Sequence, residues 1–266
     1  MNFGKYAFTF RTSLMEKLMY AGSMAGRVVV YAVLMFMFTR LWGYIYGSGE
    51  EGLVAGYTLN QMLWYVTVTE LIFFSSRSGF IRGEIAADIK SGRIAYAINK
   101  PYNYVLFVLS KYFGETATGY AFNSIVGICV GLFLIGRLET FSFASLPFLF
   151  VTFFMATMVS AFVYLAIALV SFWVEENAPF IWIYEKLVLL LGIVFPIEIF
   201  PGWAQPFIRL TPVYPSIYAP ARMAVAFSFD AWFSMLGVQA AYIAVLALVT
   251  AFIYSRGVRK LNVNGG

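Results

Sequence analysis

The sequence contains no histidine and only one cysteine, and both shortages remove kinds of chemistry. Without histidine, the chain cannot form a serine–histidine catalytic pair or an imidazole site for zinc or haem. Cys129 alone can form neither an intramolecular disulfide nor a cysteine-based metal site, and its place in an apolar run is typical of a small buried residue. We therefore expect no metal bound by this chain.

The phosphate-binding motif GxxxxGK[ST] is also missing, so no loop of that kind can hold nucleotide phosphates. Two close acidic pairs, Glu50–Glu51 and Glu175–Glu176, lie at the ends of apolar stretches, where solvated loop charges are expected. We predict no catalytic residues and no cofactor bound by the chain itself. The same absences argue against a lipid-modifying enzyme.

Charge is scarce. Charged residues make up 12% of the 266 residues and apolar residues 61%, whereas soluble domains have about 25% and about 45–50%. A soluble protein of this size could not hide so much apolar surface, but a protein embedded in a bilayer has no need to. The N-terminus lacks the short apolar core and small-residue cleavage site of a signal peptide. The composition predicts an all-α integral membrane protein.

Six apolar stretches are long enough, or nearly so, to cross a membrane, which takes about 20 residues. We predict transmembrane helices over residues 23–41, 57–76, 104–136, 145–173, 182–200 and 232–254. The third would be roughly 50 Å long, more than the hydrocarbon core of roughly 30 Å. Its first turns, which carry Lys111 and Glu115, are therefore expected at the membrane edge. Because these two residues are four apart, we also expect them to pair.

The distribution of Lys and Arg indicates the orientation of these helices. With six spans, the side that holds both termini carries Lys5, Arg11, Lys17, Arg77, Arg82, Lys90, Arg93, Lys100, Arg256, Arg259 and Lys260. The other side carries Arg40, Arg137, Arg209 and Arg222. Because cytoplasmic loops are rich in Lys and Arg, we place both termini in the cytoplasm. Basic residues spread among the spans in this way also argue against nucleic-acid binding.

Two segments that do not span the membrane have distinct patterns. Residues 3–20 have apolar side chains at steps of three and four, at Phe3, Ala7, Phe10, Leu14 and Leu18. This spacing predicts an amphipathic helix on the cytoplasmic membrane surface. Residues 196–231 hold six of the nine prolines, Pro196, Pro201, Pro206, Pro212, Pro215 and Pro220. Since proline interrupts helices, we predict short broken helices that re-enter the outer leaflet.

The 77–101 segment between the second and third spans is too patterned for a simple connection. Ile81, Ile85 and Ile89 recur every four residues and would share one helix face. Glu84 and Asp88 form a second stripe at the same spacing, and Gly92 is a suitable helix stop. Such a helix could bind a groove on a soluble partner or lie on the lipid headgroups. The pattern alone does not separate the two.

Several features together resemble a known family. They are an amphipathic N-terminal helix, two spans, the sequence Gly83-Glu84-Ile85…Asp88-Ile89-Lys90-Ser91-Gly92-Arg93…Asn99-Lys100-Pro101, four more spans with a proline-rich segment before the last, and a C-terminal Asn262-Val263-Asn264-Gly265-Gly266. Over essentially its whole length, the chain resembles the permease subunit of an ABC-2 type ABC transporter, in a six-span bacterial branch. This implies a single permease domain over residues 1–266.

The resemblance also implies partners. Such permeases pair with an identical or homologous permease, bind two separately encoded ATPase subunits that hold ATP and Mg²⁺, and mostly export compounds across the bacterial cell membrane. Their loop between spans two and three is a coupling helix that sits in a cleft of the ATPase. Carried over to this chain, the coupling residues are Gly83, Glu84, Ile85, Asp88, Ile89, Lys90, Gly92 and Arg93.

Ionisable and amide side chains inside spans are candidates for a substrate path, because burying them in lipid is costly. The candidates are Arg27, Asn60, Glu70, Asn123 and Glu198. Glu70 could form an ion pair with Arg27, and that pair could equally serve to lock two helices together. We expect a permease that exports a hydrophobic or amphiphilic compound such as a drug, an antibiotic or a lipid. The alternatives are a stand-alone secondary transporter or channel, and a membrane scaffold that does not transport.

Overall fold

The structure, a computed structural model, describes residues 3–19, 25–47, 52–174 and 176–264. Regular structure in these residues is helical throughout, with one isolated β-bridge between Val54 and Tyr57. The elements in chain order are α1 Gly4–Met19, α2 Ala25–Gly47, α3 Leu59–Ser76, η2 Phe80–Glu84, α4 Ile85–Lys90, α5 Ile94–Ile98, α6 Tyr104–Leu134, η3 Phe143–Ser145, α7 Leu146–Leu169, η4 Val170–Phe172, α8 Ala178–Val188, η5 Leu189–Val194, η6 Ile197–Ile199, α9 Gln205–Arg209, η7 Tyr214–Tyr218, α10 Ala219–Val225 and α11 Phe229–Asn264. The predicted all-α class is confirmed.

Among the residues that the structure describes, four helices are long and apolar enough to cross a membrane: Val28–Gly47, Tyr104–Leu134, Phe143–Phe172 and Phe229–Lys260. They coincide with the first, third, fourth and sixth predicted spans. The second and fifth predicted spans correspond to α3 and to α8 with η5, which are not among these four. The count of six spans therefore stays a prediction.

Helix α3 is less apolar because it lies inside the bundle. Twelve of its 18 residues are buried, Glu70 among them, and it packs against α2, α6 and α10. Neighbouring helices, not lipid, surround its polar residues. Its start is fixed by a capping box, in which Gln61 N donates to Thr58 Oγ1 at 3.2 Å and Thr58 N donates to Gln61 Oε1 at 3.1 Å.

The proline-rich segment is broken into short helices, as predicted. Helix α8 passes into the π-helix η5, which ends before Pro196, and η6, α9, η7 and α10 follow within residues 197–225. Gly192 of η5 allows η7 to approach, since a Cβ there would lie 2.8 Å from Val213 Cγ1. The Tyr65 hydroxyl of α3 donates to the Gly192 carbonyl at 2.5 Å. These contacts join the segment to the bundle.

Helix α1 packs along α6 through a close crossing at Gly114. A Cβ on Gly114 would lie 2.4 Å from Phe10 O and 2.8 Å from Ser13 Cβ, so only glycine allows this approach. The helix matches the one predicted over residues 3–20, although residue 20 lies outside the described ranges. Phe10 and Leu14 face inward, while Phe3 and Leu18 of the predicted stripe are exposed. A helix that also contacts protein cannot turn its whole apolar face to lipid.

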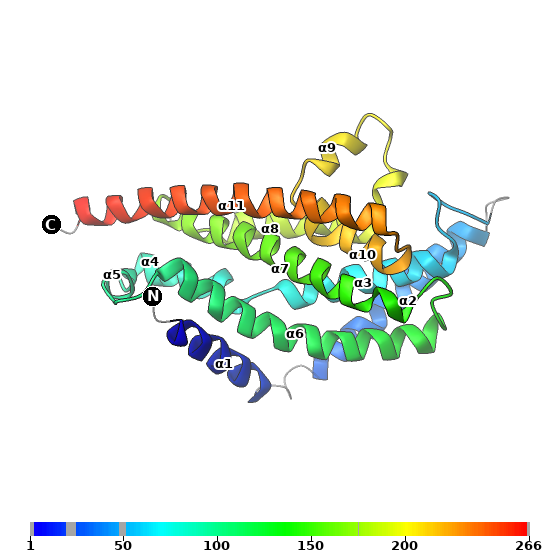
Figure 1. Cartoon of the computed structure of the whole chain (residues 1–266), viewed down its shortest axis with the longest axis horizontal. Coiled ribbons are helices and arrows are strands. Elements are labelled where there is room, and N and C mark those ends of the chain that lie inside the picture. Colours follow the sequence, from blue (N-terminus) through cyan, green and yellow to red (C-terminus); the bar gives the residue numbers. More distant parts are fainter. Residues whose placement is uncertain (1–2, 20–24, 48–51, 175, 265–266) are drawn as a thin grey trace.

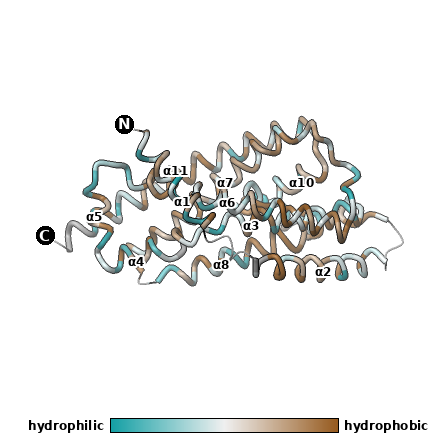
Figure 2. The backbone as a smooth tube through the Cα atoms, turned by 90° about the horizontal axis from the view of Figure 1, so that it is seen from below, coloured by the Kyte–Doolittle hydropathy of each residue, from teal (hydrophilic) through white to brown (hydrophobic). Residues whose placement is uncertain are grey.

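The long helices run side by side along the longest axis of the molecule (Figure 1). Helices α4 and α5 and the C-terminal end of α11 lie at one end, and residues 52–58, which precede α3, lie at the other (Figure 1). Hydrophobic residues follow the helices between these ends, and hydrophilic residues are frequent near α5 (Figure 2). Two core clusters lie along this axis, one that includes Ile85 and Leu169 and one that includes Trp42 and Tyr218.

Candidate functional site at the 77–101 segment

The 77–101 segment folds as three short helices, η2, α4 and α5, between α3 and α6. Gly92, with φ of +72°, ends α4 and turns the chain toward α5. A left-handed φ is strained for residues with a side chain, which explains glycine at this turn. The helix stop predicted at Gly92 is confirmed.

The apolar face of the segment points into the bundle. Ile81, Ile85 and Ile94 are fully buried and Ile89 nearly so, in a core cluster with Val108 of α6 and Leu169 of α7. Spacing by four predicted a shared face for three of these residues, and the structure shows that the chain itself covers this face. Ile85 and Ile89, both among the predicted coupling residues, therefore anchor the segment to the transmembrane helices.

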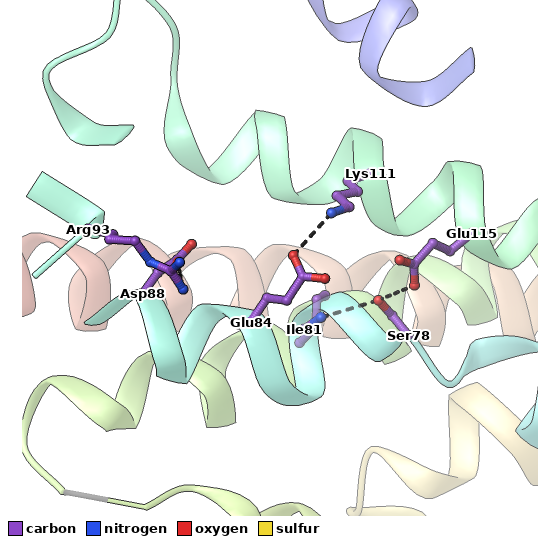
Figure 3. Close-up of polar contacts among 7 residues, drawn as sticks. All are labelled: Ser78, Ile81, Glu84, Asp88, Arg93, Lys111 and Glu115. Atoms are coloured by element: carbon purple, nitrogen blue, oxygen red, sulfur yellow. Dashed lines mark hydrogen bonds and ion pairs between the residues drawn. The ribbon is translucent and has the colours of Figure 1, made fainter. Parts of the chain in front are cut away.

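The polar side chains of the segment form ion pairs on its outer face (Figure 3). Glu84 Oε2 lies 3.2 Å from Lys111 Nζ of α6, and the same ammonium lies 4.0 Å from the centre of the Phe80 ring. Asp88 Oδ1 lies 3.0 Å from Arg93 Nη2 across the α4–α5 turn. Exposed residues alternate with these pairs, namely Gly83, Ala87, Lys90, Ser91 and Gly92. The outer surface is thus polar, of mixed charge and open.

Two further contacts join the start of the segment to α6 and α8. The Ser78 hydroxyl donates to Glu115 Oε2 of α6 at 2.7 Å and accepts from Ile81 N at 3.3 Å (Figure 3). Arg77 donates to both carboxylate oxygens of Glu185 on α8, at 3.1 and 3.0 Å. The expected pairing of Lys111 with Glu115 is wrong, because Lys111 forms an ion pair with Glu84 and Glu115 accepts a hydrogen bond from Ser78.

Three of the predicted path residues form hydrogen bonds or ion pairs between elements. Asn60 donates to the Arg137 carbonyl at 3.0 Å, at the N-terminal end of α3. Glu198 lies in the proline-rich segment, where it accepts from Tyr218 and pairs with Arg222 Nη1 at 3.0 Å. Asn123 of α6 donates to Ser75 Oγ of α3 at 2.9 Å. Each holds two elements together.

Glu70 differs from these residues. Its Oε2, like Asn60 Oδ1 and Glu198 Oε2, has no hydrogen-bond partner within the described part of the chain, but of these three residues only Glu70 is buried, at 3% exposed. The side chain of Arg27, its predicted partner, lies outside that part, so the predicted ion pair stays a prediction. A buried carboxyl in a transmembrane bundle is costly, by roughly 2.5–3.5 kcal/mol on insertion scales when charged. It therefore calls for a functional explanation.

Residues 28–265 match the protein family described as "ABC-2 family transporter protein". The chain belongs to this family. It is thus a multi-pass membrane protein and a component of an ABC transporter, and membership implies assembly with ATPase partners. None of the curated proteins matches the chain.

The sequence did not predict the contact between Arg77 and Glu185. The two residues are 108 positions apart, and Glu185 stood in a span where no local pattern marked it. The only sign of this contact in the sequence was an acidic residue, Glu185, inside the fifth apolar stretch. No group of three or more His, Cys, Asp or Glu that could hold a metal occurs in the residues that the structure describes.

Proposed function

We propose that this chain is the permease subunit of a bacterial cell-membrane ABC exporter, with six spans and both termini in the cytoplasm. Separate ATPase subunits, two copies, bind ATP and Mg²⁺, and a second permease, identical or homologous, completes the transport path. The cargo is a hydrophobic or amphiphilic compound. Family membership supports the permease role. The main structural support is the 77–101 segment, whose isoleucines pack into the bundle and whose outer face is polar.

In this proposal, the exposed residues of the segment contact the ATPase. These are Gly83, Glu84, Lys90, Gly92 and Arg93, together with the partly exposed Asp88, while Ile85 and Ile89 hold the segment on the bundle. A polar surface with both charge signs suits recognition of a soluble partner through complementary charges. An interfacial helix would instead direct its apolar face to lipid, and here the chain itself occupies that face.

Motion of the segment reaches the spans through three polar contacts. Glu84–Lys111 and Ser78–Glu115 join it to α6, and Arg77–Glu185 joins it to α8. When ATP closes the ATPase pair, the segments of two permeases move together and the spans change from inward-open to outward-open. Shifting an equilibrium from 1:99 to 99:1 takes about 5.5 kcal/mol, which nucleotide binding at two sites can supply.

A double charge swap tests the coupling surface. Asp88→Arg with Arg93→Asp keeps an ion pair at the same place but reverses the charges that a partner meets. We expect the assembled complex to lose permease-dependent stimulation of ATPase activity, by about tenfold, because like charges across an interface cost several kcal/mol. The readout is ATP hydrolysis by the complex in nanodiscs.

The matched control is Arg137→Asp with Glu139→Arg, two exposed residues in the loop after α6. These residues lie far from the 77–101 segment along α6, so this swap should leave stimulation unchanged. Unchanged ATPase stimulation in the Asp88/Arg93 swap, with both complexes intact by size-exclusion chromatography, would show that the ATPase does not read this surface.

A further inference from the structure

A cavity of about 200 Å³ lies between α2, α3 and α6. Three aromatic residues line it, Tyr31, Phe74 and Phe122, together with the amide of Asn123. Phe74 is two residues before the end of α3, so the cavity lies in the half of the bundle that carries the 77–101 segment. Val30, also at the wall, is exposed on the outer face of α2. The cavity therefore borders the lipid-facing surface.

Glu70 stands at the same face of α3. Residues spaced by three and four lie on one side of a helix, which puts Thr67, Glu70 and Phe74 in one row. The Tyr31 hydroxyl donates to the Thr67 carbonyl at 3.0 Å, so Tyr31 binds this row at one end while Phe74 lines the cavity at the other. Glu70 comes between Thr67 and Phe74 in this row; it is not itself in the cavity lining, but its carboxyl group acts electrostatically on Tyr31, which is.

The arrangement of α6 keeps Tyr31 in place. A Cβ on Gly127 would lie 3.0 Å from the Tyr31 hydroxyl oxygen, so glycine at this position lets the ring pack against α6. Because the hydroxyl of Tyr31 is committed to Thr67, it does not satisfy the Glu70 carboxylate. Asn123 donates an N–H to Ser75 at 2.9 Å, which orients its amide at the cavity wall.

Aromatic faces beside a carboxylate are the groups that recognise organic ammonium ions. An ammonium ion supplies the counter-charge that lets a buried carboxyl group ionise, whereas an uncharged or anionic ligand does not. The volume is below the ~300–1,000 Å³ of sites that enclose drug-sized molecules. It suits a head group and the first part of a chain, while the remaining chain lies along exposed apolar residues such as Val30 and Ile125.

We propose that this cavity binds the ammonium head of a single-chain cationic amphiphile, with Glu70 as its counter-ion and Tyr31, Phe74 and Phe122 around it. The amphiphile enters from the adjoining leaflet. The role of this site in export rests on the proposed transport function, because the site would bind the compound before it is transported. The binding itself requires no ATPase, so it can be measured on the permease alone.

The test uses the full chain in phosphatidylcholine nanodiscs and a dodecyltrimethylammonium probe that carries a photoreactive diazirine. The companion probe is an uncharged dodecyl alcohol with the same diazirine. After illumination, mass spectrometry identifies the labelled peptides. We expect saturable labelling by the ammonium probe on the peptides that contain Val30 and Asn123, and labelling by the alcohol that does not saturate.

Glu70→Gln is nearly isosteric and should weaken binding of the ammonium probe by about tenfold, which is the effect of losing one charge-assisted contact. Val126→Trp, at the cavity wall, should abolish saturable labelling, whereas Ile128→Trp, on the exposed face of α6, should not. Arg27→Gln should leave labelling intact or strengthen it, because the amphiphile and not Arg27 is the counter-ion.

Equal labelling of Glu70→Gln and the unaltered chain would overturn the proposal. So would saturable labelling by the alcohol, which would show a lipid-tail site only, or a loss in Arg27→Gln as large as in Glu70→Gln. Size-exclusion profiles of the variants establish that they are folded. Failure of the Asp88/Arg93 experiment would leave these results untouched, because no ATPase is present, so the two proposals fail separately.

Discussion

Arg77 and Arg256 each lie against a phenylalanine ring, but only Arg77 is also in an ion pair within the described part of the chain. Each guanidinium lies 5.3 Å from the ring of a phenylalanine four residues earlier, Phe73 and Phe252 respectively. Arg77 alone of the two is in a described ion pair, with the Glu185 side chain, which is 10% exposed. A partly buried two-point contact of this kind is stronger than a surface ion pair. The comparison isolates the effect of the carboxylate.

We expect Arg77→Met to lower the melting temperature of the detergent-solubilised protein, because it leaves a mostly buried carboxylate without this donor. The cost should be about 1–3 kcal/mol. Arg256→Met removes the same ring contact and should change the melting temperature little. Arg77→Glu with Glu185→Arg should recover part of the loss. Equal melting temperatures for the two methionine variants would mean that the pair does not stabilise the fold.

At the scale of elements, α1 is the helix with the most specific attachment. It meets α6 at Gly114, and the Thr118 hydroxyl donates to the Leu14 carbonyl at 3.3 Å. At its N-terminal end, Lys5 Nζ donates to Pro101 O at 3.0 Å and Asn103 N donates to the Tyr6 hydroxyl at 2.9 Å. Helix α1 thus bridges α6 and the end of the 77–101 segment.

Gly114→Val should detach α1, because its Cβ would overlap backbone atoms of Phe10 that cannot move aside. Trypsin should then cleave faster at Arg11 and Lys17. Gly43→Val makes the same substitution inside α2, where a Cβ meets nothing within 4 Å, and should leave the cleavage rate unchanged. Similar cleavage of both variants would contradict docking of α1 at Gly114.

Elements were predictable from the sequence where one local pattern fixes them. Apolar length gave the four long helices, proline spacing gave the broken segment 197–225, and the isoleucine stripe gave one buried face of η2 and α4. Pairings between elements were not predictable. Spacing by four suggested Lys111–Glu115, yet Glu84 of η2 and Ser78, in the connection between α3 and η2, contact these side chains instead. Such competition depends on tertiary distance, which local spacing does not encode.

The cavity beside Glu70 shows the same limit. The sequence marked Glu70 and Asn123 as costly in lipid, but the aromatic walls come from three helices, and Gly127 sets how closely Tyr31 approaches. The apolar stripe on α1 predicted the helix itself. It did not predict which of its side chains face α6, because this depends on the close crossing at Gly114. Small residues set these approaches, and their effect appears only after packing.

At the scale of the whole molecule, the number of membrane crossings decides which segments share a side. If α3 and α8 cross with the four long helices, the 77–101 segment lies on the side of the termini, opposite the proline-rich segment. If α3 and α8 stay within the bundle without crossing, both segments lie on one side, opposite the termini. Six crossings agree with the excess of Lys and Arg in the segments on the terminal side.

Single cysteines distinguish these topologies. In a Cys129→Ser background, Tyr96→Cys, Phe143→Cys and Trp203→Cys place thiols at sites that are 78%, 77% and 75% exposed, so differences in reaction report the side and not burial. With six crossings and cytoplasmic termini, an impermeant maleimide should label positions 143 and 203 in spheroplasts, and position 96 only in inverted vesicles. With four crossings, position 96 would react together with 203 and position 143 would be protected. Because position 96 lies in α5 beside Arg93, labelling from outside would also place the 77–101 segment beyond the reach of any cytoplasmic ATPase.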